Sequence, residues 1–163
     1  MKENLKEGLE PWIDGNSKVL VLGTLPGDES LKAGRYYASS RNSFWKIMNE
    51  LFPLKAGESN NKEYILSHGI ALWDCLKAGE RKGSSDSGFG EEVIPNDLEK
   101  LLADYPNVRC IVLNGTGKTS DIYYENFYEI KGVEVQACCS TSNSYPKKLE
   151  EKVKNWSILK TFI

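Results

Sequence analysis

Two short segments hold the residues whose types and spacing best suit chemistry. Gly23-Thr-Leu-Pro-Gly27 directly follows the apolar run of residues 18–22. Its glycines let backbone amides approach a bound group or a phosphate closely. Arg41-Asn-Ser-Phe-Trp45 begins with a cation and an amide. The amide of Asn42 could orient a water molecule, or it could cap a helix that starts near Ser43.

Three other kinds of site fail a check of spacing. Gly115-Thr-Gly-Lys-Thr119 looks like the end of a P-loop, but the earlier glycine that a P-loop needs would fall on Val112, inside an expected strand. The single histidine, His68, lies at the wrong end of an expected strand to serve a Ser or Cys nucleophile. The four cysteines form no Cys-x-x-Cys pair. We therefore expect buried free thiols, no metal and no cofactor.

Composition indicates one soluble globular domain of 163 residues, with 40% hydrophobic and 27% charged residues. No apolar run could span a bilayer and no signal-peptide core begins the chain, so we expect a cytoplasmic protein with no membrane partner. The formal net charge is −2, so a nucleic-acid enzyme would need its cations on one face. Candidate cations, each equally readable as a solvated surface residue, are Arg35, Arg41, Lys46, Arg81, Lys82, Lys118, Lys147 and Lys148.

The distribution of apolar and polar residues predicts the strands and helices that position these residues. Continuous apolar runs predict buried strands at residues 18–23, 70–74, 108–113 and 133–137. Helices are expected at residues 1–12, 42–52, 61–68, 95–103, 118–128 and 146–159, and a polar loop at 79–90. This order predicts an α/β fold, a three-layer αβα sandwich around a four-stranded parallel sheet. Ligands of such sheets bind beyond the carboxyl ends of the strands, at loops 24–40, 74–90, 114–119 and 139–145.

The motifs, taken in order, resemble a known family. Gly23–Gly27 and Arg41–Trp45 resemble the mismatch-specific branch of the uracil-DNA glycosylase superfamily, which carries Gly-x-Asn-Pro-Gly and then Phe-Ala-x-Pro-x-Asn-x-Phe-Trp. The hypoxanthine-DNA glycosylase (DNA-deoxyinosine glycosylase) group is more similar still. Its further blocks are Tyr36-Tyr-Ala38, Ala71-Leu-Trp-Asp74, Glu80-Arg-Lys-Gly-Ser84, Pro95-Asn-Asp97 and Ser140-Thr-Ser142. The resemblance runs from about residue 18 to residue 157 and implies one domain over residues 1–163.

The resemblance implies a monofunctional DNA glycosylase that hydrolyses the N-glycosidic bond of a flipped deaminated base and leaves an abasic site. The superfamily's first-loop Asn is Leu25 here, so the implied catalytic residue is Asn42 and the implied base is hypoxanthine. A uracil or mismatch-specific glycosylase stays open as an alternative. So does a nucleic-acid-binding module without catalysis.

A flipped base needs a stacking ring and groups that read its edge. Tyr37 aligns with the family's stacking aromatic. Asp74 could accept from N1–H of hypoxanthine, and Asn114 could bond its carbonyl or N7, although a cap and a turn residue are equal interpretations. The loop residues Gly23, Thr24, Leu25, Pro26 and Gly27 complete the expected substrate contacts.

The late loop and Arg41 are the expected DNA contacts. Ser140, Thr141 and Ser142 offer small hydroxyls to phosphates. Asn143 or Tyr145 could enter the duplex. The family's Pro-Ser-Thr-Ser-Pro-Ala-Asn is replaced by Cys139-Ser-Thr-Ser-Asn-Ser-Tyr145, and its His-Pro by Ser39-Ser40. The expected partner is single- or double-stranded DNA with a damaged base, bound by a monomer.

Overall fold

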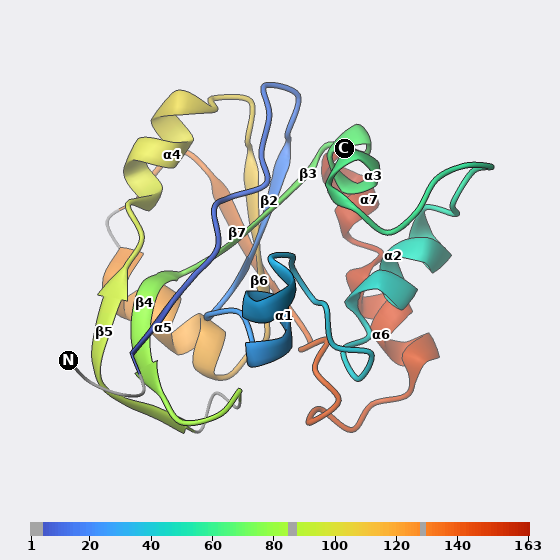
Figure 1. Ribbon diagram of the computed structural model, residues 1–163. Helices are drawn as coiled ribbons and strands as arrows, with labels where there is room; N and C mark the ends of the chain where they lie inside the picture. The colour runs from blue at the N-terminus through green and yellow to red at the C-terminus, as the bar shows by residue number, and fades with distance from the viewer. Residues whose placement is uncertain (1–4, 85–87, 128–129) are drawn as a thin grey trace.

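The computed structural model describes residues 5–84, 88–127 and 130–163, which Figure 1 shows as a ribbon. Its strands are β1 (Leu5–Glu7), β2 (Val19–Gly23), β3 (Ile70–Asp74), β4 (Leu76–Arg81), β5 (Phe89–Pro95), β6 (Cys110–Asn114) and β7 (Glu134–Cys138). Its helices are α1 (Asp28–Ala33), α2 (Phe44–Leu51), α3 (Lys62–Ser67), α4 (Leu98–Asp104), α5 (Lys118–Phe127), α6 (Leu149–Trp156) and α7 (Leu159–Phe162).

The parallel sheet has the strand order β3-β2-β6-β7, which confirms the four predicted strands. Val19 of β2 lies opposite Ile70 of β3 on one side and Cys110 of β6 on the other. Every residue of β2, β3 and β6 is buried, because neighbouring layers cover both faces of these strands. That double burial explains why each of the three strands has a continuous apolar sequence. Strand β7 forms an edge of the sheet and is more exposed.

Helices lie on both sides of this sheet, so the predicted three-layer αβα sandwich is confirmed. In Figure 1, α2, α3, α6 and α7 gather on one side, and α4 and α5 on the other. Aromatic side chains join α2 to α6, since Phe44 meets the fully buried Trp156 edge to face at 6.2 Å between ring centroids. In the described ranges, no helix is both long and apolar enough to cross a membrane.

A second, antiparallel sheet with the order β1-β4-β5 was not predicted. Leu5 of β1 pairs with Glu80 of β4, and β4 with β5 forms a hairpin. The helix expected over residues 1–12 is therefore wrong for its described part. The polar loop expected over 79–90 is shorter than expected, because residues 79–81 belong to β4 and residues 89–90 to β5. Residues 1–4 and 85–87 lie outside the described residues. Strand pairing depends on partners far away in the sequence, so the local charge pattern of the first residues was a poor guide.

Several helix ends also differ from the expected positions. Helix α1 follows the first loop and was not expected. Helix α4 begins at Leu98 because Pro95 still belongs to β5. The last predicted helix is divided into α6 and α7 and starts at Leu149 rather than at Pro146. Tyr128, the expected end of α5, lies outside the described residues.

The side chain of Asp97 caps α4 by accepting a hydrogen bond from Lys100 N at 3.2 Å. Its neighbour Asn96, the other candidate cap, instead donates from Nδ2 to the backbone oxygen of Asp74 at 2.8 Å. The block Pro95-Asn-Asp97 therefore both starts a helix and supports the end of β3.

We predict that Asp97→Ala lowers the free energy of unfolding by about 1 kcal/mol, because an N-terminal amide of α4 loses its acceptor. The matched control is Asp104→Ala at the other end of the helix, whose exposed ion pair with Lys100 should contribute under about 0.5 kcal/mol. Urea unfolding measures both losses. Equal losses for the two variants would contradict the capping role.

Candidate active site

A cavity of about 670 Å³ lies at the carboxyl ends of the parallel strands. Among the residues singled out from the sequence, those that line it are Gly23, Thr24, Leu25, Pro26, Gly27, Tyr37, Arg41, Asn42, Asp74, Asn114, Ser140, Thr141, Ser142 and Asn143. Tyr145 does not line it. Cavity residues that the sequence did not single out include Glu29, Ser30, Ser84, Thr119 and Ser144. Glu29 and Ser30 belong to the unexpected helix α1, and only the Glu-Arg-x-Gly-Ser block hinted at Ser84.

Strand ends place Asp74 beside the first loop. Gly23 pairs with Asp74 across β2 and β3. A Cβ built on Gly23 would lie only 2.6 Å from Asp74 Oδ1 and 3.6 Å from the Tyr37 hydroxyl. Only glycine leaves room here for the carboxylate. Asp74 is buried, with just 5% of its surface exposed. The carboxylate and the tyrosine therefore meet over the start of the loop.

The ring of Tyr37 is held on one face by Phe44. The two rings stack with centroids 4.1 Å apart and planes 19° apart. Tyr37 has a φ of 54°, an uncommon left-handed conformation for a residue that is not glycine. Such backbone strain persists only where the surroundings enforce it. The stack and the hydroxyl contact with Asn114 supply that enforcement.

Asn114, at the end of β6, joins three segments through its side chain. Its Nδ2 donates to the Tyr37 hydroxyl at 3.1 Å and to Thr141 Oγ1 at 2.9 Å, while its Oδ1 accepts from Thr141 N at 3.0 Å. Thr141 O in turn accepts from Ser43 N at 2.8 Å. Both N–H groups of the Asn114 amide thus bind protein atoms. In the structure the Asn114 side chain therefore links loops to one another, whereas the sequence suggested that it contacts the base. We call these three hydrogen bonds the Asn114 bracket.

Asn42 uses its amide oxygen at the start of α2. Oδ1 accepts from Phe44 N at 2.9 Å, so the capping interpretation of Asn42 has a structural counterpart. The nominal cap position, Ser43, makes no capping bond with its side chain. Within the described part of the chain, Nδ2 of Asn42 makes no hydrogen bond, and the residue lines the cavity. The two N–H groups of this amide are what Asn42 can offer a ligand.

The late loop is folded on itself and on α6. Ser142 N donates to Ser140 Oγ at 3.1 Å, and the hydroxyls of Ser142 and Ser144 lie 3.0 Å apart. Lys152 of α6, itself buried, donates from Nζ to Ser142 O at 3.1 Å and lies over the Tyr145 ring at 5.7 Å. Burial lowers the pKa of Lys152. Asn143 is exposed at the cavity, whereas Tyr145 packs beside Lys152.

Two expected contact residues turn out to be buried. Thr141 has no exposed surface, and its hydroxyl accepts from Asn114, so in this arrangement it faces protein rather than a phosphate. Arg81 also has no exposed surface and donates to backbone carbonyls, so its inclusion among the surface cations was wrong. Arg41 is exposed and lines the cavity.

Leu25, which stands where the superfamily has its first-loop Asn, is 5% exposed and belongs to the core. Its Cδ1 would lie 3.4 Å from a Cβ built on Gly8, which places the side chain against the N-terminal segment. An apolar side chain packed there cannot hold a water molecule. Among the described residues, no three His, Cys, Asp or Glu side chains gather as a metal site would require.

We predict that Asn114→Ala lowers the free energy of unfolding by about 2–4 kcal/mol. The change leaves the buried Thr141 N–H without an acceptor and removes the hydrogen bond to Tyr37. Asn126→Ala is the control, since that exposed side chain makes one bond within its own helix, at 2.8 Å to Ile122 O. Its loss should stay under about 1 kcal/mol. Chemical unfolding compares the two, and a loss for Asn114→Ala no larger than the control's would contradict the bracket.

Comparisons with known proteins identify the family of this chain. Residues 10–160 match the profile of the Uracil DNA glycosylase superfamily. Proteins named Hypoxanthine DNA glycosylase from Methanosarcina barkeri and Methanosarcina acetivorans are 31% and 34% identical over 155 residues, 93% of this chain and 96% of each relative. A solution NMR structure from Methanosarcina acetivorans, described as a uracil DNA glycosylase candidate, superposes with a TM-score of 0.76 at 31% identity, covering 96% of this chain and 99% of that one. The resemblance noted in the sequence is confirmed, and this chain belongs to the uracil DNA glycosylase superfamily.

Proposed function

We propose that this protein is a monofunctional DNA glycosylase that removes hypoxanthine from deoxyinosine in DNA and leaves an abasic site. The observation that carries the proposal is that the Tyr37 hydroxyl and the Asp74 carboxylate both lie next to Gly23, beside a first loop whose Leu25 is buried in the core. The names of the two Methanosarcina relatives support the same base. A cavity of about 670 Å³ accommodates a purine nucleotide.

Asp74 suits the pairing edge of hypoxanthine. Hypoxanthine carries a hydrogen on N1, which an ionised carboxylate accepts, whereas adenine presents a lone pair at N1 and would be repelled. This difference matters because adenine is the undamaged parent base. Tyr37, backed by Phe44, offers a rigid ring for the flipped base, and such stacking contributes about 1–3 kcal/mol per base.

Asn42 is the proposed catalytic residue. Its Oδ1 already accepts from Phe44 N, whereas Nδ2 makes no hydrogen bond within the described residues, so we assign the catalytic contact to Nδ2. The N–H groups of Nδ2 donate either to the oxygen of the attacking water or to the departing base. Breaking an N-glycosidic bond passes through an oxocarbenium-like state, so positioning and charge stabilisation suffice without a strong base. The products are the free base and an abasic site, with water supplying hydroxyl to the sugar carbon and a proton to the base.

DNA would lie across the mouth of the cavity, with a single protein molecule per damaged site. Arg41 and the exposed part of the late loop supply cationic and hydroxyl contacts to phosphates. Asn143 is better placed than Tyr145 to enter the duplex, because Tyr145 packs beside Lys152 away from the cavity lining.

A panel of labelled duplexes tests the substrate. Each carries one deoxyinosine, uracil or xanthine, and alkali cleaves any abasic site that forms. We expect strand cleavage at deoxyinosine and none at deoxyadenosine in the same strand. Cleavage at uracil alone would favour the uracil-specific alternative, and binding without any cleavage would favour the non-catalytic module.

We predict that Asn42→Asp slows excision about 100-fold while leaving the free energy of unfolding within about 0.5 kcal/mol of the parent. The aspartate keeps an oxygen for Phe44 N but lacks the two amide N–H groups. Asn42→Ala should lose both the cap and the excision. Single-turnover rates and urea unfolding measure the two effects separately. Parental excision by Asn42→Asp would leave Asn42 as a helix cap only.

A further inference from the structure

Arg81 is a buried cation for which the proposed chemistry has no direct use. It ends strand β4, and its guanidinium lies over the ring of Phe89 at 5.2 Å from the ring centroid. Burying a guanidinium is unfavourable unless hydrogen bonds replace its hydration. The partners of Arg81 therefore indicate where its effect is felt.

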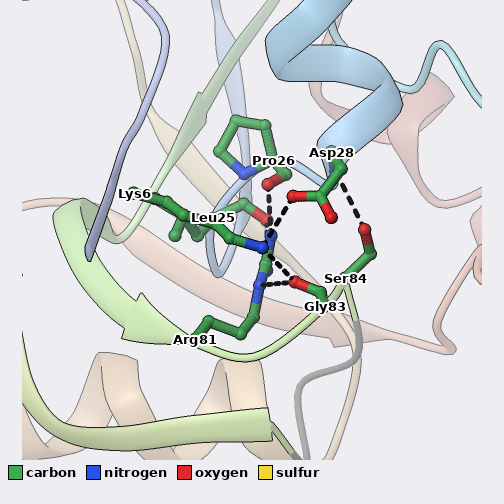
Figure 2. A network of polar contacts seen from close by, with 7 residues as sticks. All are labelled: Lys6, Leu25, Pro26, Asp28, Arg81, Gly83 and Ser84. Atoms are coloured by element: carbon green, nitrogen blue, oxygen red, sulfur yellow. Dashed lines mark hydrogen bonds and ion pairs between the residues drawn. The ribbon is translucent and has the colours of Figure 1, made fainter. Parts of the chain in front are cut away.

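Those partners include the first loop, as Figure 2 shows. Arg81 Nη1 donates to Leu25 O at 3.0 Å, Nη2 donates to Pro26 O, and Nε donates to Gly83 O at 3.2 Å. One planar fork thus holds two successive carbonyls of the first loop and one carbonyl of its own hairpin. Arginine suits this task because its donors have a fixed planar arrangement.

The carbonyls just before these two are held from the same side of the loop. Gly23 O accepts from Cys75 N at 2.8 Å, and Thr24 O accepts from Leu76 N at 3.1 Å. Cys75 directly precedes β4, and Leu76 is the first residue of that strand. Four successive carbonyls of the loop, from residues 23 to 26, are therefore bound by the segment that ends in Arg81.

This arrangement determines where the loop's amides point. In a trans peptide the N–H points opposite to the C=O, and the described residues contain no cis peptide bond. The N–H groups of Leu25 and Gly27 are therefore directed away from β4. Neither amide donates a hydrogen bond within the described residues, and both residues line the cavity. Pro26 has no N–H, so these two are adjacent donors along the loop.

The far end of the loop is held by the same hairpin. Ser84 Oγ accepts from Asp28 N at 2.9 Å, at the start of α1. Lys6 Nζ donates to Asp28 Oδ1 at 2.7 Å and to Gly83 O at 2.6 Å (Figure 2). The hydrogen bond from Lys6 holds the pKa of Asp28 below its usual value. The loop is thus fixed along its length and at its exit into α1.

We propose that Arg81 is a positioning residue for base excision. Its guanidinium holds the Leu25 and Pro26 carbonyls and so turns the Gly27 amide toward the bound nucleotide, beside the Leu25 amide that the Leu76 N–H directs through Thr24 O, while Ser84 fixes the exit of the loop. The inference rests on the proposed glycosylase function. Arg81 touches no substrate in this scheme. Lysine cannot replace it, because one ammonium group does not reproduce a planar fork across two carbonyls.

Single-turnover excision of deoxyinosine at saturating enzyme tests the proposal with Arg81→Lys, Ser84→Ala and the control Lys77→Ala. Lys77 is exposed on the same hairpin. A displacement of about 1 Å in a catalytic loop can cost about 100-fold in rate, so we expect a loss of that order for Arg81→Lys. Ser84→Ala, which removes one neutral hydrogen bond at the rim, should lose about threefold. Lys77→Ala should match the parent.

Amplitude and rate separate positioning from folding. A purely structural role would lower the fraction of active enzyme and leave the rate constant of the active fraction unchanged, and that result would overturn the proposal. If Arg81→Lys does not fold, Ser84→Ala serves instead. A parental rate constant for Ser84→Ala would overturn the proposal that contacts from the hairpin position the first loop.

Amide spectra give a readout that needs no activity. In ¹H–¹⁵N correlation spectra, Arg81→Lys should shift the resonances of the Leu25 and Gly27 amides, while Lys77→Ala should leave them in place. Unshifted amides would overturn the proposal. A parent enzyme that leaves deoxyinosine intact would refute the proposed function alone, because the spectra would still test the anchoring.

Discussion

The hydrogen bonds of one amide, that of Asn114, hold the candidate active site together. The side chain links the end of β6 to Tyr37 and to Thr141, and Thr141 extends the link to the start of α2. These segments come from distant parts of the chain, and the parallel sheet alone does not fix their loops relative to one another. A buried bracket does so because its donors and acceptors are all directional. The Tyr37 ring and the Asn42 amide are thereby held at one cavity.

A second set of contacts holds the backbone segments that line the cavity. Asn96 holds the backbone at Asp74, and Arg81 holds the carbonyls of the first loop. Both residues belong to sequence blocks shared with hypoxanthine-DNA glycosylases, yet neither side chain lines the cavity. The antiparallel sheet, which looks peripheral in Figure 1, therefore has a direct bearing on the site. Its strand β4 supplies both Leu76 N, which directs the Leu25 amide, and the Arg81 fork, which directs the Gly27 amide.

Leu25 and Asn42 together decide which polar groups the first loop and the start of α2 present to the cavity. A core side chain at position 25 removes a polar group from the first loop and anchors that loop against the N-terminal segment. The neighbouring amide at position 42 remains, with its oxygen committed to α2 and its nitrogen available. The proposed chemistry thus uses donors from Asn42 and from the loop backbone, together with the carboxylate of Asp74.

The sequence by itself determined the parallel sheet, most of the helices and many of the residues around the cavity, because apolar runs and loop composition are local properties. It did not reveal the antiparallel sheet, since β1 pairs with β4 far along the chain and the polar composition of residues 79–90 hid the β4–β5 hairpin. Nor did it assign tasks to individual atoms. Only the tertiary structure decided that the Asn114 side chain links distant loops and that Arg81 is buried against the first loop. The physical reason is that a polar group becomes available to a ligand only when no distant segment has already satisfied its hydrogen bonds.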